Sequence, residues 1–275
     1  MRDSQAHDEI NRREPPEQEE ALQAALYRSF AQTEALSEMW TSFEVRRGTA
    51  LAGDDRATPF EPTSQWIGTF VNVAFDNLRT VKLIIQDAQT MPMSAHFGLL
   101  RNALEAAGVG LWLIGPGARD TRVLRTLQLS YENRRDEHNL NGVIGGSAGR
   151  LTSDDATVAR LNEIRDARAG IAGLSLSPPS ISTRLRSAQE FAGQHDFPLL
   201  TMWKLTSGVA HGRRSAMFHL LDREVISTNE RGANIWMTSS FGSVAGTHQI
   251  TLHYLMRLLR TALSRNGTHS PLPTN

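Results

Sequence analysis

Two short segments place ionisable side chains among apolar or small residues. Residues 99–107 read Leu-Leu-Arg-Asn-Ala-Leu-Glu-Ala-Ala, and residues 205–214 read Leu-Thr-Ser-Gly-Val-Ala-His-Gly-Arg-Arg. Arg101 and Glu105 are four residues apart, which puts them on one face of a helix. A charge among such neighbours needs a partner, because leaving it unpaired is costly. We expect Arg101, Glu105 and His211 to form one polar cluster between packed helices.

His211 has a structural and a chemical interpretation. It follows small residues, and the adjacent Gly212 and the earlier Gly208 suit a close backbone approach or a helix end. The imidazole could therefore cap the carbonyl groups of a helix end. A catalytic or ligand-binding histidine is the alternative, because Arg213 and Arg214 can bind an anion or a phosphate.

Residues 145–149, Gly-Gly-Ser-Ala-Gly, match the G-x-S-x-G sequence that carries the serine hydrolase nucleophile, with Ser147 at its centre. That turn needs a strand before it and a helix after it in a parallel sheet. Here a charged helix is expected before the glycines, and strands do not alternate with crossover helices. A flexible linker is the favoured interpretation. A phosphate loop is also disfavoured, because the Lys-Ser/Thr that should follow is missing.

Composition excludes several kinds of chemistry. The 275 residues include no cysteine, which excludes disulfides, thiolate nucleophiles and cysteine-ligated metals. There is no H-E-x-x-H sequence, and His248 and His253 are five residues apart, so they project from different helix faces. We expect no metal and no other cofactor. The 29 basic and 29 acidic residues balance, so no overall positive field attracts nucleic acid or an anionic membrane.

Hydrophobic periodicity predicts a series of helices joined by short loops. Residues 46–63, rich in Gly, Asp and Pro, and the glycine-rich residues 142–149 are expected to be loops. Two segments have strand character and predict a hairpin, namely residues 218–226 and 234–238. The expected helices cover residues 22–43, 65–90, 95–114, 120–140, 156–168, 183–192, 198–210 and 243–263.

The expected fold is therefore mainly α, a bundle of about seven to eight helices with a small β-hairpin near residues 218–238. Residues 19–264 should form one helical domain. Residues 1–18 are polar and acidic and contain two consecutive prolines, which predicts a disordered tail. Residues 265–275 should form a flexible tail.

Two expectations concern the surroundings of the chain. The sequence starts without an apolar signal core and has no stretch approaching the roughly 20 apolar residues that span a bilayer, so we expect a cytoplasmic protein and no membrane partner. The small-residue face of residues 95–114 and the apolar stripe of residues 243–263 exceed the need of one domain. One of these faces should therefore meet a second copy, giving a homo-oligomer, most simply a dimer.

The L-R-x-x-L-E sequence at residues 100–105 and the S-G-V-A-H-G sequence at residues 207–212 resemble bacterial all-helical proteins of the HEPN superfamily. The resemblance covers about residues 65–260. It implies a protein of a bacterial defence or stress system, and active members of that superfamily are metal-independent ribonucleases, often dimeric. Their signature is an arginine, a polar residue and a histidine after four to six intervening residues. The segment from Arg214 to His219 fits, and Arg213 fits with one more residue.

The resemblance implies RNA as the partner. His219 would act as general base or acid at a ribose 2′-hydroxyl, and Arg214 would stabilise charge on the phosphate. The residues leave another class of function open, a non-enzymatic helical module. In that module Arg101, Glu105 and His211 form a buried network that specifies helix packing. A serine hydrolase at Ser147 is the third interpretation.

Overall fold

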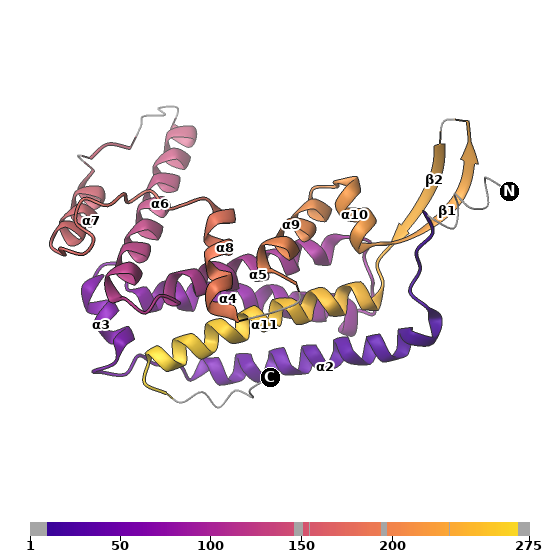
Figure 1. The fold of residues 1–275 in the computed structure, drawn as a ribbon, viewed down its shortest axis with the longest axis horizontal. Helices are drawn as coiled ribbons and strands as arrows, with labels where there is room; N and C mark the ends of the chain where they lie inside the picture. The colour runs from indigo at the N-terminus through magenta and orange to yellow at the C-terminus, as the bar shows by residue number, and fades with distance from the viewer. Residues whose placement is uncertain (1–9, 146–150, 154, 194–196, 231, 269–275) are drawn as a thin grey trace. The chain divides into compact units, whose positions relative to one another are not determined.

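The computed structural model describes residues 10–145, 151–153, 155–193, 197–230 and 232–268 (Figure 1). The chain forms two compact units, each built from three chain segments. Unit 1 comprises Met1–Phe43, Asn72–Gly108 and Gly193–Met256, and unit 2 comprises Glu44–Val71, Val109–Ala192 and Arg257–Asn275. Three helices contribute residues to both units, namely α4 (Thr63–Lys82), α5 (Ala95–Ile114) and α11 (Phe241–Arg265).

The fold is mainly α with one small antiparallel hairpin, as the sequence predicted. Ten α-helices lie among the described residues, more than the seven to eight expected, because two short ones were not foreseen. One of them, α3 (Ala50–Ala57), lies in the predicted loop. The Thr49 hydroxyl caps it by accepting a hydrogen bond from the Ala52 N–H at 3.2 Å. The helix predicted over residues 65–90 is α4, which ends at Lys82 and continues as a π-helical turn, η1 (Leu83–Asp87).

The second unexpected helix, α10 (Arg214–Leu220), shortens the predicted first strand. The hairpin consists of β1 (Asp222–Asn229) and β2 (Gly232–Thr238), so residues 218–220 are helical, not extended. The cause is tertiary packing against α9 (Leu199–Ala210). A Cβ on Gly208 would lie only 2.4 Å from the Cβ of Ala216, so the two helices meet where only a glycine fits.

Part of the predicted disordered tail is ordered. Residues 1–9 lie outside the described residues, but Arg12 pairs with Arg223 through two backbone hydrogen bonds of 2.7 and 3.0 Å. The Glu14 N–H also donates to the Asp222 carboxylate at 2.8 Å, and α2 (Pro16–Thr41) follows directly. An edge strand leaves backbone N–H and C=O groups unpaired. The polar segment around Arg12 is ordered because it forms hydrogen bonds with such groups of β1, although it has few apolar side chains to bury.

In unit 1, α2 lies beside the first part of α11 (Figure 1). The Phe30 ring is buried on α2 and meets the imidazole of His248 edge-on, with the ring centroids 5.0 Å apart. The Ser29 hydroxyl lies 2.6 Å from His248 Nδ1. The buried imidazole therefore has a hydrogen-bonding partner although it packs against an aromatic ring, as is usual for buried polar groups.

In unit 2, α6 (Arg119–Gly145) lies between α3 and α7 (Ala156–Asp166), and α8 (Ile181–Ala192) follows them in the chain (Figure 1). The Asp155 carboxylate caps α7 by accepting from the Thr157 and Val158 N–H groups. A hydrophobic cluster fills the space between these helices, formed by Ala57, Val123, Leu127, Leu161, Ile171 and Leu176.

Two of the expected loops and tails fall partly outside the described residues. Helix α6 continues to Gly145, so residues 142–145 are helical, not part of a linker, while residues 146–150 are not described. Helix α11 ends at Arg265, and residues 269–275 are not described.

The two helices that were expected to offer a face to a second copy, α5 and α11, are largely buried within the fold. By length and composition α5 could cross a membrane, contrary to the expectation from sequence, but 72% of that stretch is buried within the structure. The stripe of α11 is also buried, including Leu252, Leu255 and Leu259. The argument that one of these faces must meet a second subunit therefore fails for α11, because its apolar side chains are already covered by the chain itself.

Candidate functional site

Arg101 and Glu105 form the expected pair on α5, and a tryptophan completes the cluster. Arg101 Nη2 lies 2.9 Å from Glu105 Oε2, and the Trp203 indole N–H donates to the same oxygen at 2.7 Å. The Arg101 guanidinium also lies 5.2 Å from the centroid of the Trp203 ring. The two charged side chains are 25% and 32% exposed, so the cluster is half-buried rather than enclosed.

His211 does not take the place expected for it. It is exposed at the end of α9, where Gly212 adopts a φ of +67°. Among the described residues no hydrogen bond or ion pair joins its side chain to Arg101 or Glu105. The buried Arg-Glu-His network is therefore replaced by Arg101, Glu105 and Trp203, because the chain turns at Gly212 and leaves the imidazole in solvent.

Arg213, Arg214 and His219 lie on or beside α10. Arg213 is the N-cap residue, and all three side chains are exposed. Neither arginine forms an ion pair within the described part of the chain, and the Arg12 guanidinium donates to the His219 carbonyl at 2.6 Å. Arg214 and His219 are five positions apart, with four residues between them, which places them about 140° apart around the helix axis. The spacing that the resemblance highlights thus does not bring the two side chains to one face of α10.

Two further expectations concern Ser147 and metal ions. Ser147 lies outside the described residues, so nothing is observed of the proposed hydrolase turn. In the described ranges no group of three or more His, Asp or Glu side chains could hold a metal ion.

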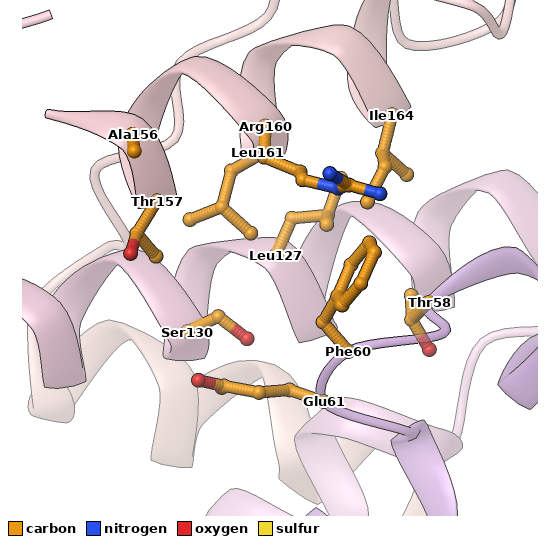
Figure 2. Close-up of a pocket in the computed structure, with 10 residues that line it drawn as sticks. All are labelled: Thr58, Phe60, Glu61, Leu127, Ser130, Ala156, Thr157, Arg160, Leu161 and Ile164. Carbon is orange, nitrogen blue, oxygen red and sulfur yellow. The ribbon is translucent and has the colours of Figure 1, made fainter. Parts of the chain in front are cut away.

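A pocket of about 430 Å³ opens in unit 2 between α6, α7 and the loop that precedes α4 (Figure 2). Its size is within the range of small-molecule sites. Apolar side chains line much of it, and Leu127, Leu161 and Ile164 connect it to the hydrophobic cluster of unit 2. The remaining lining residues are Thr58, Phe60, Glu61, Ser130, Ala156, Thr157 and Arg160.

Two oxygen atoms of the pocket wall are buried without a partner. Ser130 is only 1% exposed, and its hydroxyl forms no hydrogen bond within the described residues. Glu61 is half-buried as a residue, but its Oε2 atom is shielded from solvent and also forms no hydrogen bond within them. Figure 2 shows both groups on the side of the pocket opposite α7. Buried polar groups are normally paired, and an unsatisfied one costs about 1–3 kcal/mol.

Arg160 and Phe60 form the mouth of this pocket. The guanidinium carbon lies 3.9 Å from the centroid of the Phe60 ring, a cation–π contact that Figure 2 shows above the ring. Phe60 is 58% exposed, so its ring lies at the solvent edge of the pocket. An aromatic ring and a guanidinium therefore border an apolar interior that has two unsatisfied oxygen atoms in its wall.

No motif in the sequence pointed to this site. Glu61 fell in a predicted loop and Ser130 in the middle of a predicted helix, and nothing in their spacing relates them. One usable signal was the segment Pro59-Phe60-Glu61-Pro62, where two prolines restrict the backbone around an aromatic ring and a carboxylate.

Comparisons of the chain with protein-family models, with curated proteins and with solved structures found no match. The function is therefore inferred from the geometry of the described residues.

Proposed function

We propose that this protein is a non-catalytic binding protein that holds a small, mainly apolar molecule in the pocket between α6 and α7. The observation that supports this function is the pair of unsatisfied buried oxygen atoms, on Glu61 and Ser130, in the wall of an apolar pocket. A ligand that fills the pocket buries apolar surface and can also satisfy these atoms.

Binding is favoured over catalysis by the pocket's own residues. Nucleophilic catalysis needs a hydroxyl hydrogen-bonded to a base. The Ser130 hydroxyl has no such bond within the described residues, and no histidine lines the pocket. The hydroxyl of Thr58 is used within the fold, because it donates to the Asp54 carbonyl at 3.1 Å.

Methyl NMR with indole as a neutral apolar probe tests the proposal. We expect the resonances of Leu127, Leu161 and Ile164 to shift with saturable dependence on indole concentration. The methyl groups of Leu26 and Leu255, which are buried in unit 1, serve as the internal control and should not move. Absence of any shift at the three pocket residues would contradict the proposal.

A second candidate function follows from the exposed basic residues of α10. Arg213 and Arg214 are exposed without an ion pair in the described part of the chain, beside the exposed His211 and His219. Unneutralised arginines suit phosphate groups. This supports RNA as a partner, in line with the resemblance to HEPN proteins, as a proposal separate from the pocket.

RNA binding is tested by fluorescence anisotropy on a labelled single-stranded RNA. The variant Arg213→Ala/Arg214→Ala should weaken binding. The slope of log affinity against log salt concentration should also become shallower, by an amount equivalent to up to about two phosphate contacts. The matched control Arg28→Ala/Arg186→Ala removes the same charge from exposed arginines of α2 and α8 and should leave affinity unchanged. Equal losses in both variants would indicate nonspecific attraction only.

Catalysis by the same segment is tested separately, with purified protein in a metal chelator. If the HEPN-like chemistry operates, RNA fragments should carry 2′,3′-cyclic phosphate ends, and Arg214→Ala/His219→Ala should abolish cleavage while the protein stays folded. Binding without cleavage would leave RNA as a partner and remove the ribonuclease activity.

A further inference from the structure

We infer that the ligand of the α6–α7 pocket carries a protonated amine, which Glu61 and Ser130 receive, on an aromatic or aliphatic body. This inference rests on the proposed binding function and specifies the class of ligand. The acceptors are the two buried oxygen atoms without partners, one of them on a carboxylate. An ammonium group offers three N–H donors and a positive charge, so one group can satisfy both atoms.

The distribution of charge in the pocket favours a cation over an anion. Arg160 is the other charged residue of the lining, and an anionic ligand would be drawn to its guanidinium. That guanidinium is exposed and already rests on the Phe60 ring at 3.9 Å, whereas the Glu61 oxygen is shielded from water and has nothing to bind. A ligand gains more by pairing with the Glu61 oxygen than with Arg160, because the Glu61 oxygen is buried without a hydrogen bond and the Arg160 guanidinium is hydrated. The carboxylate therefore determines the preferred ligand.

The apolar part of the ligand would lie against α7 and α6. Leu127 and Leu161 are buried members of the hydrophobic cluster, and Ile164 packs against it. The Phe60 ring, which is 58% exposed, borders the pocket beside Arg160 and offers a further aromatic surface (Figure 2).

Three probes with one indole ring and different ends test the ligand class, measured by calorimetry and by the methyl shifts of Leu127 and Leu161. Tryptamine carries an amine, tryptophol a hydroxyl and indole-3-propionate a carboxylate. We expect tryptamine to bind at least about tenfold more tightly than tryptophol, equivalent to about 1.4 kcal/mol, and the propionate to bind more weakly than both.

Variants then identify the residues that cause the preference for tryptamine. Glu61→Gln keeps the shape of the side chain and removes its charge, so it should abolish the preference for tryptamine, and Ser130→Ala should reduce it. Glu163→Gln is the matched control, because Glu163 is an exposed carboxylate of α7 that does not line the pocket. Circular dichroism confirms that each variant is folded.

The outcomes separate this inference from the function on which it rests. If indole shifts the pocket methyl groups but tryptophol or the propionate binds as tightly as tryptamine, the pocket binds small molecules and the amine preference is wrong. Retention of the preference in Glu61→Gln would also overturn it. If no probe shifts the pocket methyl groups, the binding function itself fails.

Discussion

At the scale of single residues, unit 2 depends on a buried ion pair between α3 and α6. Asp54 accepts from Arg122 Nε at 2.6 Å and from Nη2 at 2.9 Å, and both side chains are almost fully buried. Arg122 Nη1 also donates to the carbonyls of Pro116 and Gly117, which ties α6 to the end of α5. Such a pair need not add net stability, but removing one partner strands a buried charge.

We expect Asp54→Ala to lower the free energy of unfolding by about 3–5 kcal/mol, because Arg122 would be left unpaired in the interior. Urea denaturation measures the change. Asp136→Ala is the control, since Asp136 pairs with Arg135 on the surface and should cost less than about 1 kcal/mol. Equal effects of the two substitutions would mean that the Asp54 pair is accessible to solvent.

Two buried histidines make stability depend on pH. Burial lowers the pKa of His96 from 6.5 to about 4 and that of His248 from 6.5 to about 3. Below pH 6.5 the unfolded chain therefore takes up protons that the folded chain does not. The free energy of unfolding must then decrease as pH falls from about 6.5 toward 4.

For the two histidines together we expect a loss on the order of 3 kcal/mol between pH 7 and pH 5, measured by urea denaturation at several pH values. Carboxylates contribute lower on the pH scale; for Asp155, the hydrogen bond from Arg134 lowers the pKa to about 2. His248→Gln should remove about half of the slope. A flat stability profile in the parent protein would show that the two imidazoles are hydrated.

At the scale of elements, close backbone approach decides where α9 and α10 meet. Gly208 on α9 faces Ala216 on α10. The Cβ of Ala216 is bonded directly to the helix backbone, so it cannot move away by a side-chain rotation. Gly246 in α11 is different, because a Cβ there would meet nothing within 4 Å. The same substitution should therefore have opposite effects at the two positions.

Gly208→Ala is expected to destabilise the protein by about 1–3 kcal/mol, because α10 must shift to admit the methyl group. Gly246→Ala should stabilise it by up to about 1 kcal/mol, because alanine reduces the conformational freedom of the unfolded chain. Thermal melts of both variants check the signs. A stabilising Gly208→Ala would show that α10 packs more loosely than the structure indicates.

At the scale of the whole molecule, the apolar stripe of α11 is used inside the fold. Leu255 is completely buried, as are its neighbours along the apolar stripe of α11. The case for a homo-oligomer therefore does not rest on this stripe, and a second copy would have to use another surface.

We accordingly expect Leu255→Asp to unfold the protein rather than to separate subunits. A lone carboxylate in this position costs several kcal/mol. Thermal melts combined with light scattering distinguish the two results. A folded Leu255→Asp variant of half the parent mass would restore the interface at α11 and contradict the packing described here.

Local sequence signals determined most of the helices. The 3.6-residue apolar period found α2, α5, α6 and α11, and the expected end of the helix at residue 114 agrees with the end of α5 at Ile114. The helix end expected beside Gly212 was predictable because it depends on neighbours within one helical turn, and Gly212 has a left-handed φ there. The Arg101–Glu105 pair belongs to this class, since i and i+4 residues meet on any helix.

The remaining features depend on residues that only the fold brings together. Trp203, not His211, contacts Glu105, and the polar segment around Arg12 pairs with the edge of β1. Asp54 of α3, a helix in a predicted loop, pairs with Arg122 of α6. The pocket combines Glu61 from a loop with Ser130 from α6 and Arg160 from α7. Sequence periodicity reports which face of an element is apolar, but the identity of the neighbour across that face is set by the packing of the whole chain.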